Sequence, residues 1–235
     1  MQTYSNFKRA KVLGVKIDDV SKEEGLEIVE RWRGGGKLIF TPGPEFLVTA
    51  QRDLEFKRIL NAGDLNLPDG YGLKIFGGIT HVVPGVEFML ALCELAVKNN
   101  LTIGLLGGQD IVAQKTAQVL KAKFPKIRIA FAIEEPDVLR YSDILFVAFG
   151  HPKQEKFLYR LKKDEPLKGS SFLVGMGVGG SFDFISGQVP EPGTIYRRLG
   201  LKWLGRFLAR PAYMLPKIYK AVVLFPLLIL KDKFS

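Results

Sequence analysis

The sequence predicts an α/β protein with a Rossmann-like parallel sheet flanked by helices. Apolar runs of strand length alternate with glycine-rich turns and helical patterns between residues 101 and 180. A repeated order of strand, glycine turn and helix is typical of parallel βαβ units. The 235 residues suffice for one large domain, and no low-complexity linker divides them. We therefore expect a Rossmann-like core over residues 1–196 and a C-terminal appendage over residues 197–235.

The first hundred residues are expected to contain two strands and three helices. Ser21 and Glu24 have the spacing of a capping box, which marks a helix start, and three consecutive glycines end that helix. A glycine-broken stretch is expected over residues 71–84. The expected strands are 12–17 and 37–41, and the expected helices are 21–33, 45–62 and 86–99.

The second half has a more regular pattern. Its expected strands are 101–106, 127–132, 144–149 and 171–176, and its expected helices are 109–124 and 153–161. Ligands of parallel α/β sheets bind beyond the carboxyl ends of the strands. The glycine-rich turns that follow these strands are therefore the expected ligand-binding positions.

The net charge of +10 is concentrated at the C-terminus. Residues 197–235 contain nine Lys or Arg and one acid, a balance of +8, whereas the first 196 residues contain 25 basic and 23 acidic residues. Trp, Phe and Leu alternate with these cations, as expected of a helix in the interface of an anionic membrane. A packed C-terminal helix is the alternative. Nucleic-acid binding would require the charge but not the apolar surface, so no nucleic acid is expected as a partner.

Neither a membrane span nor a metal site is expected from the sequence. The apolar run 221–230 is half the length of a spanning helix and contains Pro226, so it is expected to pack or to dip into the membrane. The N-terminus lacks the apolar core of a signal peptide. One cysteine and two histidines give no Cys/His metal set, and no cofactor is expected. We expect a cytoplasmic protein at the inner face of the membrane; the sequence leaves homo-oligomer formation open.

Asp69 is the strongest candidate for a catalytic residue. It lies in the turn Asn66-Leu67-Pro68-Asp69-Gly70, directly after an apolar run. A carboxylate at the end of a buried element suits a general base, which must be held within hydrogen-bond reach of its proton. Pro-Asp-Gly is also a common turn sequence, so a plain turn is the alternative.

Two glycine turns could bring backbone amides close to a phosphate. Gly107 and Gly108 follow a strand and precede a helix, the usual place for such a site. They do not form a G-x-G-x-x-G motif, and no acid is expected at the end of the next strand, which disfavours a nicotinamide enzyme. In the run 175–183, Gly177, Gly179, Gly180 and Asp183 are candidate ligand-binding residues. A tight turn or a packing crossover is the alternative at both places.

Two further strand ends carry polar turns. In the segment 150–155, the amide of Gln154 could bind a sugar or a base, although an exposed helix start is the alternative. The segment 41–45 places Thr41 and Gly43 at another strand end. Together these turns surround the candidate carboxylate and predict a site for a diphosphate-bearing ligand.

Six segments in this order resemble the bacterial WecB/TagA/CpsF family, the N-acetylmannosaminyltransferases of glycosyltransferase family 26. They are residues 41–42, 64–70, 84–85, 150–156, 175–183 and 199–204. The resemblance implies a metal-independent, inverting transfer from a UDP-sugar to a polyprenyl-diphosphate-linked sugar in teichoic acid or related surface-glycan synthesis. It also implies that the C-terminal appendage docks on the membrane and helps to close the active site.

The resemblance gives individual residues a role. It implies that Asp69 is the catalytic base and that Thr41 and Gln154 line the same pocket, while Arg206 is a candidate arm cation for the diphosphate. The chain departs from the family pattern at Gly43, where the family has Asn, and at Val82, where it has Arg. These departures keep a second hypothesis open, a catalytically degenerate nucleotide-sugar-binding or scaffold protein of the same fold.

Overall fold

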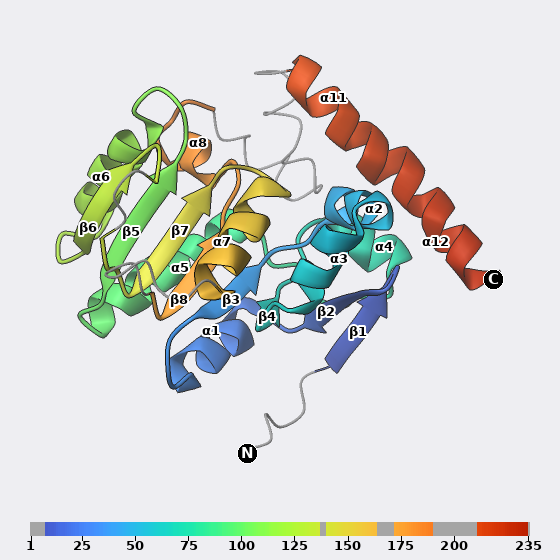
Figure 1. The fold of residues 1–235 in the computed structure, drawn as a ribbon, viewed down its shortest axis with the longest axis horizontal. Helices are drawn as coiled ribbons and strands as arrows, with labels where there is room; N and C mark the ends of the chain where they lie inside the picture. The colour runs from blue at the N-terminus through green and yellow to red at the C-terminus, as the bar shows by residue number, and fades with distance from the viewer. Residues whose placement is uncertain (1–7, 137–139, 164–171, 190–210, 235) are drawn as a thin grey trace.

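A computed structural model describes residues 8–136, 140–163, 172–189 and 211–234 (Figure 1). Its centre is a six-stranded, wholly parallel sheet in the order β4-β3-β8-β7-β5-β6. The strands are β3 (Lys37–Phe40), β4 (Leu65–Asn66), β5 (Thr102–Gly107), β6 (Arg128–Ile133), β7 (Ile144–Ala148) and β8 (Val174–Gly177). The predicted fold class, a parallel α/β sheet flanked by helices, is confirmed.

Helices cover both faces of this sheet. One face packs against α1 (Lys22–Arg31), α5 (Gly85–Lys98), α6 (Val112–Lys123) and α8 (Ser181–Ile185). The other packs against α2 (Pro44–Arg52), α3 (Leu54–Asn61), α4 (Tyr71–Phe76) and α7 (Lys153–Lys163). Successive strand residues alternate between the two cores, with Ile39 in the first and Leu38 and Phe40 in the second, as the two-residue period of a strand requires. Apolar side chains on both faces explain why these strands read as unbroken apolar runs.

The N-terminal strand prediction was wrong in its extent. Instead of one strand at 12–17, the chain forms an antiparallel hairpin of β1 (Lys8–Val12) and β2 (Val15–Asp19). Its two turn residues, Leu13 and Gly14, both have positive φ (50° and 77°). Such a turn matches the twist of a hairpin, but leucine rarely adopts this conformation, so the sequence does not signal it. Leu13 is buried, and its packing offsets the strain.

Two helix predictions also needed correction. The single helix expected at 45–62 is divided at Asp53, whose carboxylate accepts a hydrogen bond from the Phe56 N–H (2.9 Å) and caps α3. The stretch expected to be irregular after Gly70 instead begins with the short helix α4.

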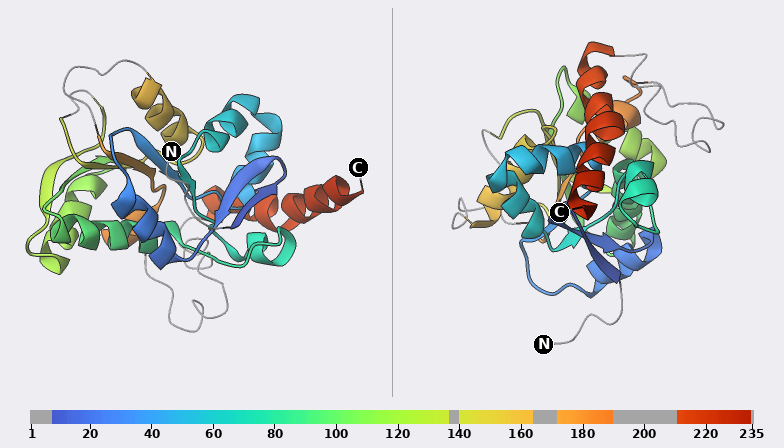
Figure 2. Two further views of the ribbon diagram at one scale, coloured as in Figure 1. Left: turned by 90° about the horizontal axis from the view of Figure 1, so that it is seen from below. Right: turned by 90° about the vertical axis from the view of Figure 1, so that its right-hand side faces the viewer.

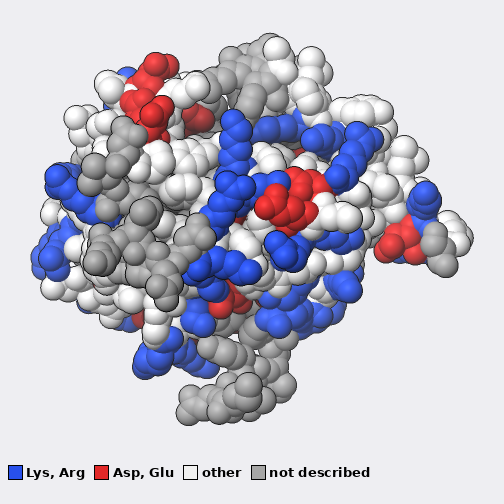
Figure 3. All heavy atoms as spheres, viewed as in Figure 1, with Lys and Arg blue, Asp and Glu red and all other residues white. Residues whose placement is uncertain are grey.

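On the face in Figure 3, Lys and Arg side chains gather near the centre around a few acidic ones. Ion pairs of Lys156 with Asp53 and Glu55 (2.8 and 2.7 Å) join α7 to α3.

A C-terminal helix lies across the domain (Figures 1 and 2). It comprises α11 (Pro211–Tyr219), a π-helical turn η1 (Lys220–Leu224) and α12 (Phe225–Lys233), and it packs against α2 and α4. The π turn ends two residues before Pro226, whose ring and missing N–H disturb the regular hydrogen-bond ladder of the helix. The apolar run 221–230 packs in part, because Phe225 and Ile229 are buried. The expected boundary at 196/197 lies outside the described residues.

No helix in the described part of the chain combines the length and the apolar character needed to span a bilayer.

Candidate active site at the carboxyl edge of the sheet

A cleft of about 1860 Å³ runs along the carboxyl edge of the sheet. The segments that follow all six strands contribute to its lining, together with the start of α5 and the inner side of the C-terminal helix. Of the predicted site residues, those that line the cleft are Thr41, Gly43, Asp69, Gly108, Gln154, Gly179, Gly180 and Asp183. The parallel topology therefore brings together turns that are far apart in the sequence.

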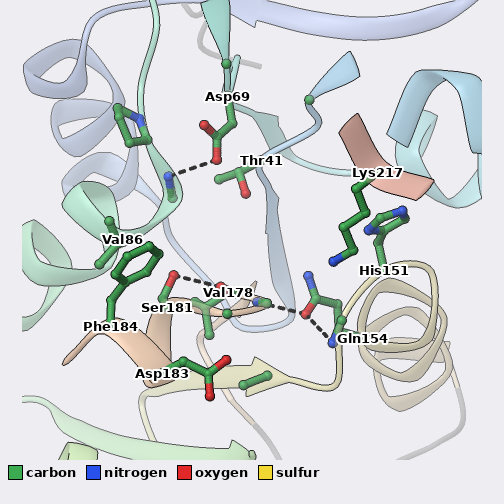
Figure 4. A pocket seen from close by; sticks show the side chains of 18 of the residues that line it. Thr41, Asp69, Val86, His151, Gln154, Val178, Ser181, Asp183, Phe184 and Lys217 are labelled. Carbon is green, nitrogen blue, oxygen red and sulfur yellow. Dashed lines mark hydrogen bonds between the residues drawn. The ribbon is translucent and has the colours of Figure 1, made fainter. Parts of the chain in front are cut away.

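Asp69 lies at the amino end of α5. The Gly85 N–H donates to Asp69 Oδ2 (3.3 Å), and this helix terminus favours a negative charge. Thr41 lies beside Asp69, and both side chains border Gly85 (Figure 4). A side-chain Cβ at Gly85 would be 3.1 Å from Thr41 Oγ1 and 3.7 Å from Asp69 Oδ2. The half-buried carboxylate thus faces the cleft next to a hydroxyl group.

Backbone hydrogen bonds hold the Asp69 turn from two sides. The Asp69 N–H donates to the Pro42 carbonyl (3.2 Å), and the Val83 N–H donates to the Pro68 carbonyl (2.7 Å). A Cβ on Gly43 would lie 2.9 Å from the Asp69 carbonyl oxygen, so the absence of a side chain at Gly43 lets the two turns pack closely. Gly70 has a φ of 96°, which explains why glycine follows the aspartate.

The loop after β8 forms another part of the wall. Gly179 and Gly180 line the cleft, and Ser181 begins α8, with its hydroxyl donating to the Val178 carbonyl (2.7 Å). Asp183 also lines the cleft and, in Figure 4, lies well away from Asp69.

Two predicted glycines, Gly107 and Gly177, are not among the residues that line the cleft. Gly107 packs against the end of β7, where a Cβ would be 2.9 Å from the Ala148 carbonyl carbon. Gly177 packs against α7, where a Cβ would be 2.8 Å from Gln154 Nε2. Close packing of the chain accounts for glycine at both positions. The predicted Arg206 lies outside the described residues.

Two acids that the sequence did not lead us to expect follow β6. Glu134 and Glu135 come directly after this strand and line the cleft, so the expectation of no acid there was wrong. The strand runs one residue further than predicted, which brings Glu134 to its end. The Ile111 N–H donates to Glu134 Oε1 (2.7 Å) and ties the end of β6 to the start of α6. Carboxylates at this position in Rossmann-like folds bind ribose hydroxyls.

Lys217 was also missed. It lies on α11, lines the cleft and, in Figure 4, extends towards His151 and Gln154. The His151 ring stacks on Phe46, with 4.4 Å between ring centroids. Burial, with the nearby positive charges of Lys217 and Lys220, lowers the pKa of His151 to about 3. His151 is therefore neutral at neutral pH, and Lys217 supplies positive charge to this wall.

Acidic side chains outnumber basic ones in the described lining. Figure 3 shows an acidic group over the ends of β5 and β6, where the cleft extends. The charged lining residues are Glu45, Asp69, Glu87, Asp110, Glu134, Glu135 and Asp183 against Lys123, Lys153 and Lys217. The binding affinity of this cleft for a diphosphate would therefore depend strongly on each cationic side chain close to the ligand.

Glu155 is a fully buried acid behind the cleft wall. Desolvation raises the pKa of its carboxyl from 4.5 to about 7, although the hydrogen bond from Gln154 opposes the shift. Because the pKa of Glu155 is higher in the folded state than in the unfolded state, protonation of this carboxyl stabilises the fold. This contribution to the free energy of unfolding is fully present below about pH 4.5. It is lost as the pH rises through about 7.

Replacing this acid should flatten the pH dependence of stability. Between about pH 4.5 and 8, the free energy of unfolding should fall by up to about 3 kcal/mol more in the wild type than in Glu155→Gln. Urea unfolding of both proteins at several pH values measures the difference. Parallel curves for the two proteins would show that Glu155 titrates normally.

The fold and the site define an α/β protein with a carboxylate and glycine loops facing one cleft, an arrangement typical of enzymes that bind phosphorylated ligands. Sequence comparison makes the class specific. A model of the glycosyl transferase WecG/TagA/CpsF family matches residues 10–235, and the chain belongs to this family of glycosyltransferases. The resemblance noted from its motifs is thereby confirmed.

Three named relatives match most of the chain. A protein of Bacillus spizizenii (strain W23) is 28% identical over 208 residues, covering 80% of this chain and 79% of its own. One of Bacillus subtilis (strain 168) is 28% identical over 191 residues, with 75% and 73% covered. One of Staphylococcus aureus (strain MRSA252) is 25% identical over 223 residues, with 87% and 86% covered. All three are named N-acetylglucosaminyldiphosphoundecaprenol N-acetyl-beta-D-mannosaminyltransferase.

Proposed function

We propose that this protein is an inverting, metal-independent glycosyltransferase working at the inner face of the bacterial membrane. It moves N-acetylmannosamine or a related hexose from a UDP-sugar to a polyprenyl-diphosphate-linked sugar, in teichoic acid or other surface-polysaccharide synthesis. The names of the three relatives support this choice of sugar and acceptor. The observation that carries the proposal is the Asp69 carboxylate, held at the amino end of α5 and facing the cleft.

Asp69 acts as the general base in this proposal. It takes the proton of the acceptor hydroxyl while that oxygen attacks the anomeric carbon from the face opposite UDP. The carbon–oxygen bond to UDP breaks as the new glycosidic bond forms, which inverts the configuration. Thr41, which lines the cleft beside Asp69, hydrogen-bonds the same sugar in this proposal. The amino end of α5 favours the carboxylate form that a base requires.

The UDP leaving group occupies the rest of the cleft. In this proposal the diphosphate is bound by Lys217, the Gly179-Gly180 loop and the Gly108 turn, which all line the cleft. Glu134 or Glu135, also in the lining, accepts bonds from ribose hydroxyls. Fixed hydrogen-bond donors directed at a developing negative charge usually make the largest single contribution to an enzyme's rate enhancement.

Lys217→Ala tests this part of the proposal. Losing one charge-assisted contact should lower kcat/KM for the UDP-sugar by roughly 10–100-fold, because such hydrogen bonds contribute about 1.5–3 kcal/mol. EDTA should leave wild-type activity unchanged. Lys121→Ala, at an exposed lysine on α6 outside the cleft lining, is the matched control. Wild-type kinetics for Lys217→Ala, or activity abolished by EDTA and restored by a divalent cation, would contradict this account of leaving-group stabilisation.

The C-terminal helix supports a membrane location. Met214, Phe225 and Ile229 are buried against the domain, whereas the opposite side exposes large apolar side chains. The exposed apolar residues of this helix that do not line the cleft are Leu215, Tyr219, Val223, Leu227, Leu230 and Phe234. An exposed apolar surface of this kind, with Lys231 and Lys233 near its end, suits the interface of an anionic membrane.

A donor screen tests the function itself. The purified protein is incubated with several UDP-sugars and a lipid-diphosphate-linked sugar, and released UDP is measured. Release with one donor, dependent on the acceptor, is expected. Binding of a UDP-sugar without release of UDP from any donor would instead favour the nucleotide-sugar-binding alternative, for which the departures at Gly43 and Val82 are the motivation.

A further inference from the structure

The side-chain amide of Gln154 joins two loops of the cleft wall. Its Oε1 accepts hydrogen bonds from the Gly150 N–H (3.1 Å), after β7, and from the Gly179 N–H (2.9 Å), after β8. These bonds use both lone pairs of the oxygen. Gln154 can therefore contact a ligand only through its nitrogen, as a donor. Gln154 is among the residues that line the cleft, and only 2% of it is exposed there.

Glu155 accepts the other hydrogen bond of this amide. Gln154 Nε2 donates to Glu155 Oε1 (2.7 Å), and the Glu155 side chain is fully buried. Glu155 Oε2 makes no hydrogen bond within the described part of the chain. A buried carboxyl with an unsatisfied oxygen costs free energy, and an apolar side chain of similar size would be cheaper. The packing of the domain therefore does not explain a glutamate at this position.

The strand below is shaped to admit this pair. A Cβ on Gly177 would lie 2.8 Å from Gln154 Nε2 and 2.9 Å from Glu155 Oε1. Glycine at this point of β8 leaves the space in which the two side chains meet. Three separate segments, the β7–α7 turn, the first turn of α7 and the end of β8, thus converge on one amide.

We propose that Glu155 is a positioning residue for the donor diphosphate. By accepting a hydrogen bond from Gln154 Nε2, it fixes the orientation of the Gln154 amide. In this orientation Oε1 holds the loops at Gly150 and Gly179, and the remaining N–H of Nε2 is available to the ligand. This role rests on the proposed function, because it assigns the clamped wall to the UDP moiety. Without an acceptor at position 155, Nε2 loses its buried partner, and the amide can move away from the position in which Oε1 accepts from both loops. The loops then open, and the donor binds a wall that is no longer preorganised.

Two substitutions separate positioning from packing. Glu155→Met fills the space without an acceptor, whereas Glu155→Gln keeps an acceptor oxygen. We expect Glu155→Met to fold with a Tm equal to or above that of the wild type, to raise KM for the UDP-sugar roughly tenfold or more, and to speed amide hydrogen exchange at Gly150 and Gly179. Glu155→Gln should restore both the KM and the slow exchange. Glu94→Met, an exposed position on α5 away from the cleft lining, is the control.

Each result bears on one proposal. A folded Glu155→Met protein with wild-type KM and wild-type exchange at both glycines would overturn the positioning role. If Glu155→Gln raised the KM and sped the amide exchange as much as Glu155→Met, the acceptor oxygen would not be the cause of these effects. The proposal would fail in that case as well. A wild-type protein that releases no UDP would refute the proposed function, while the exchange measurement would still decide whether Glu155 holds the two loops.

Discussion

Asp69→Asn should turn over about 10²–10⁴-fold more slowly than the wild type, because a positioned general base contributes that factor. Asparagine has nearly the same shape, and its side-chain oxygen can still accept from the Gly85 N–H, so the turn should remain intact. The affinity for the UDP-sugar should be unchanged, since Asp69 is proposed to act on the acceptor. Steady-state kinetics and donor-binding calorimetry measure the two effects separately.

Glu45→Gln is the matched comparison for this variant. A Cβ on Gly43 would lie 3.3 Å from Glu45 Oε2 and 2.9 Å from the Asp69 carbonyl, so this second carboxylate lies at the same end of the cleft. We expect its removal to change kcat far less than Asp69→Asn does. If Glu45→Gln lost activity and Asp69→Asn kept it, the base would have to be reassigned to Glu45.

The second large effect is expected at the membrane. Replacing Leu227 and Leu230 together with Asp should weaken binding to anionic vesicles by about 100-fold or more, because each apolar side chain contributes about 1.5–3 kcal/mol when buried. The added negative charges also oppose binding to anionic lipid. Both side chains are more than half exposed (57% and 52%), so the domain should still fold. Vesicle sedimentation measures the binding.

A position outside the C-terminal helix controls for the mere loss of a surface leucine. Leu54 on α3 is 74% exposed, and Leu54→Asp should bind vesicles like the wild type. Raised salt should weaken binding of the wild type, because exposed charges are screened. Unchanged vesicle binding by the double variant would show that this face of the C-terminal helix does not dock on the membrane.

Much of the core could be predicted because its signals are local. The strands β5 and β7 are apolar runs followed by glycine turns, and both faces of the sheet are covered, so length and flanking residues identify them. The hairpin turn was missed because Leu13 adopts a backbone conformation that its own sequence does not favour. The break at Asp53 was missed because a capping aspartate inside a helical pattern resembles an ordinary exposed position.

The site could be predicted only where a local turn carried the signal. Asp69 was found because its Pro-Asp-Gly turn is a signal in the local sequence. The inward direction of Lys217 depends on how the C-terminal helix packs, and apolar residues occur on both sides of that helix. Glu155 occupies the first turn of a helix, where a glutamate is normally solvated, so its burial could not be foreseen. Gly177 shows the reverse case, a glycine expected at a ligand that instead makes room for two side chains.

The most direct test of the central claim is a transfer assay with wild type and Asp69→Asn side by side. UDP-N-acetylmannosamine and related UDP-sugars are offered with lipid-diphosphate-linked N-acetylglucosamine, and the glycolipid product is identified by mass and anomeric configuration. The account predicts one sugar transferred with inversion by the wild type, and at least about 100-fold less product from Asp69→Asn. Equal product from both proteins, or a product with retained configuration, would contradict it.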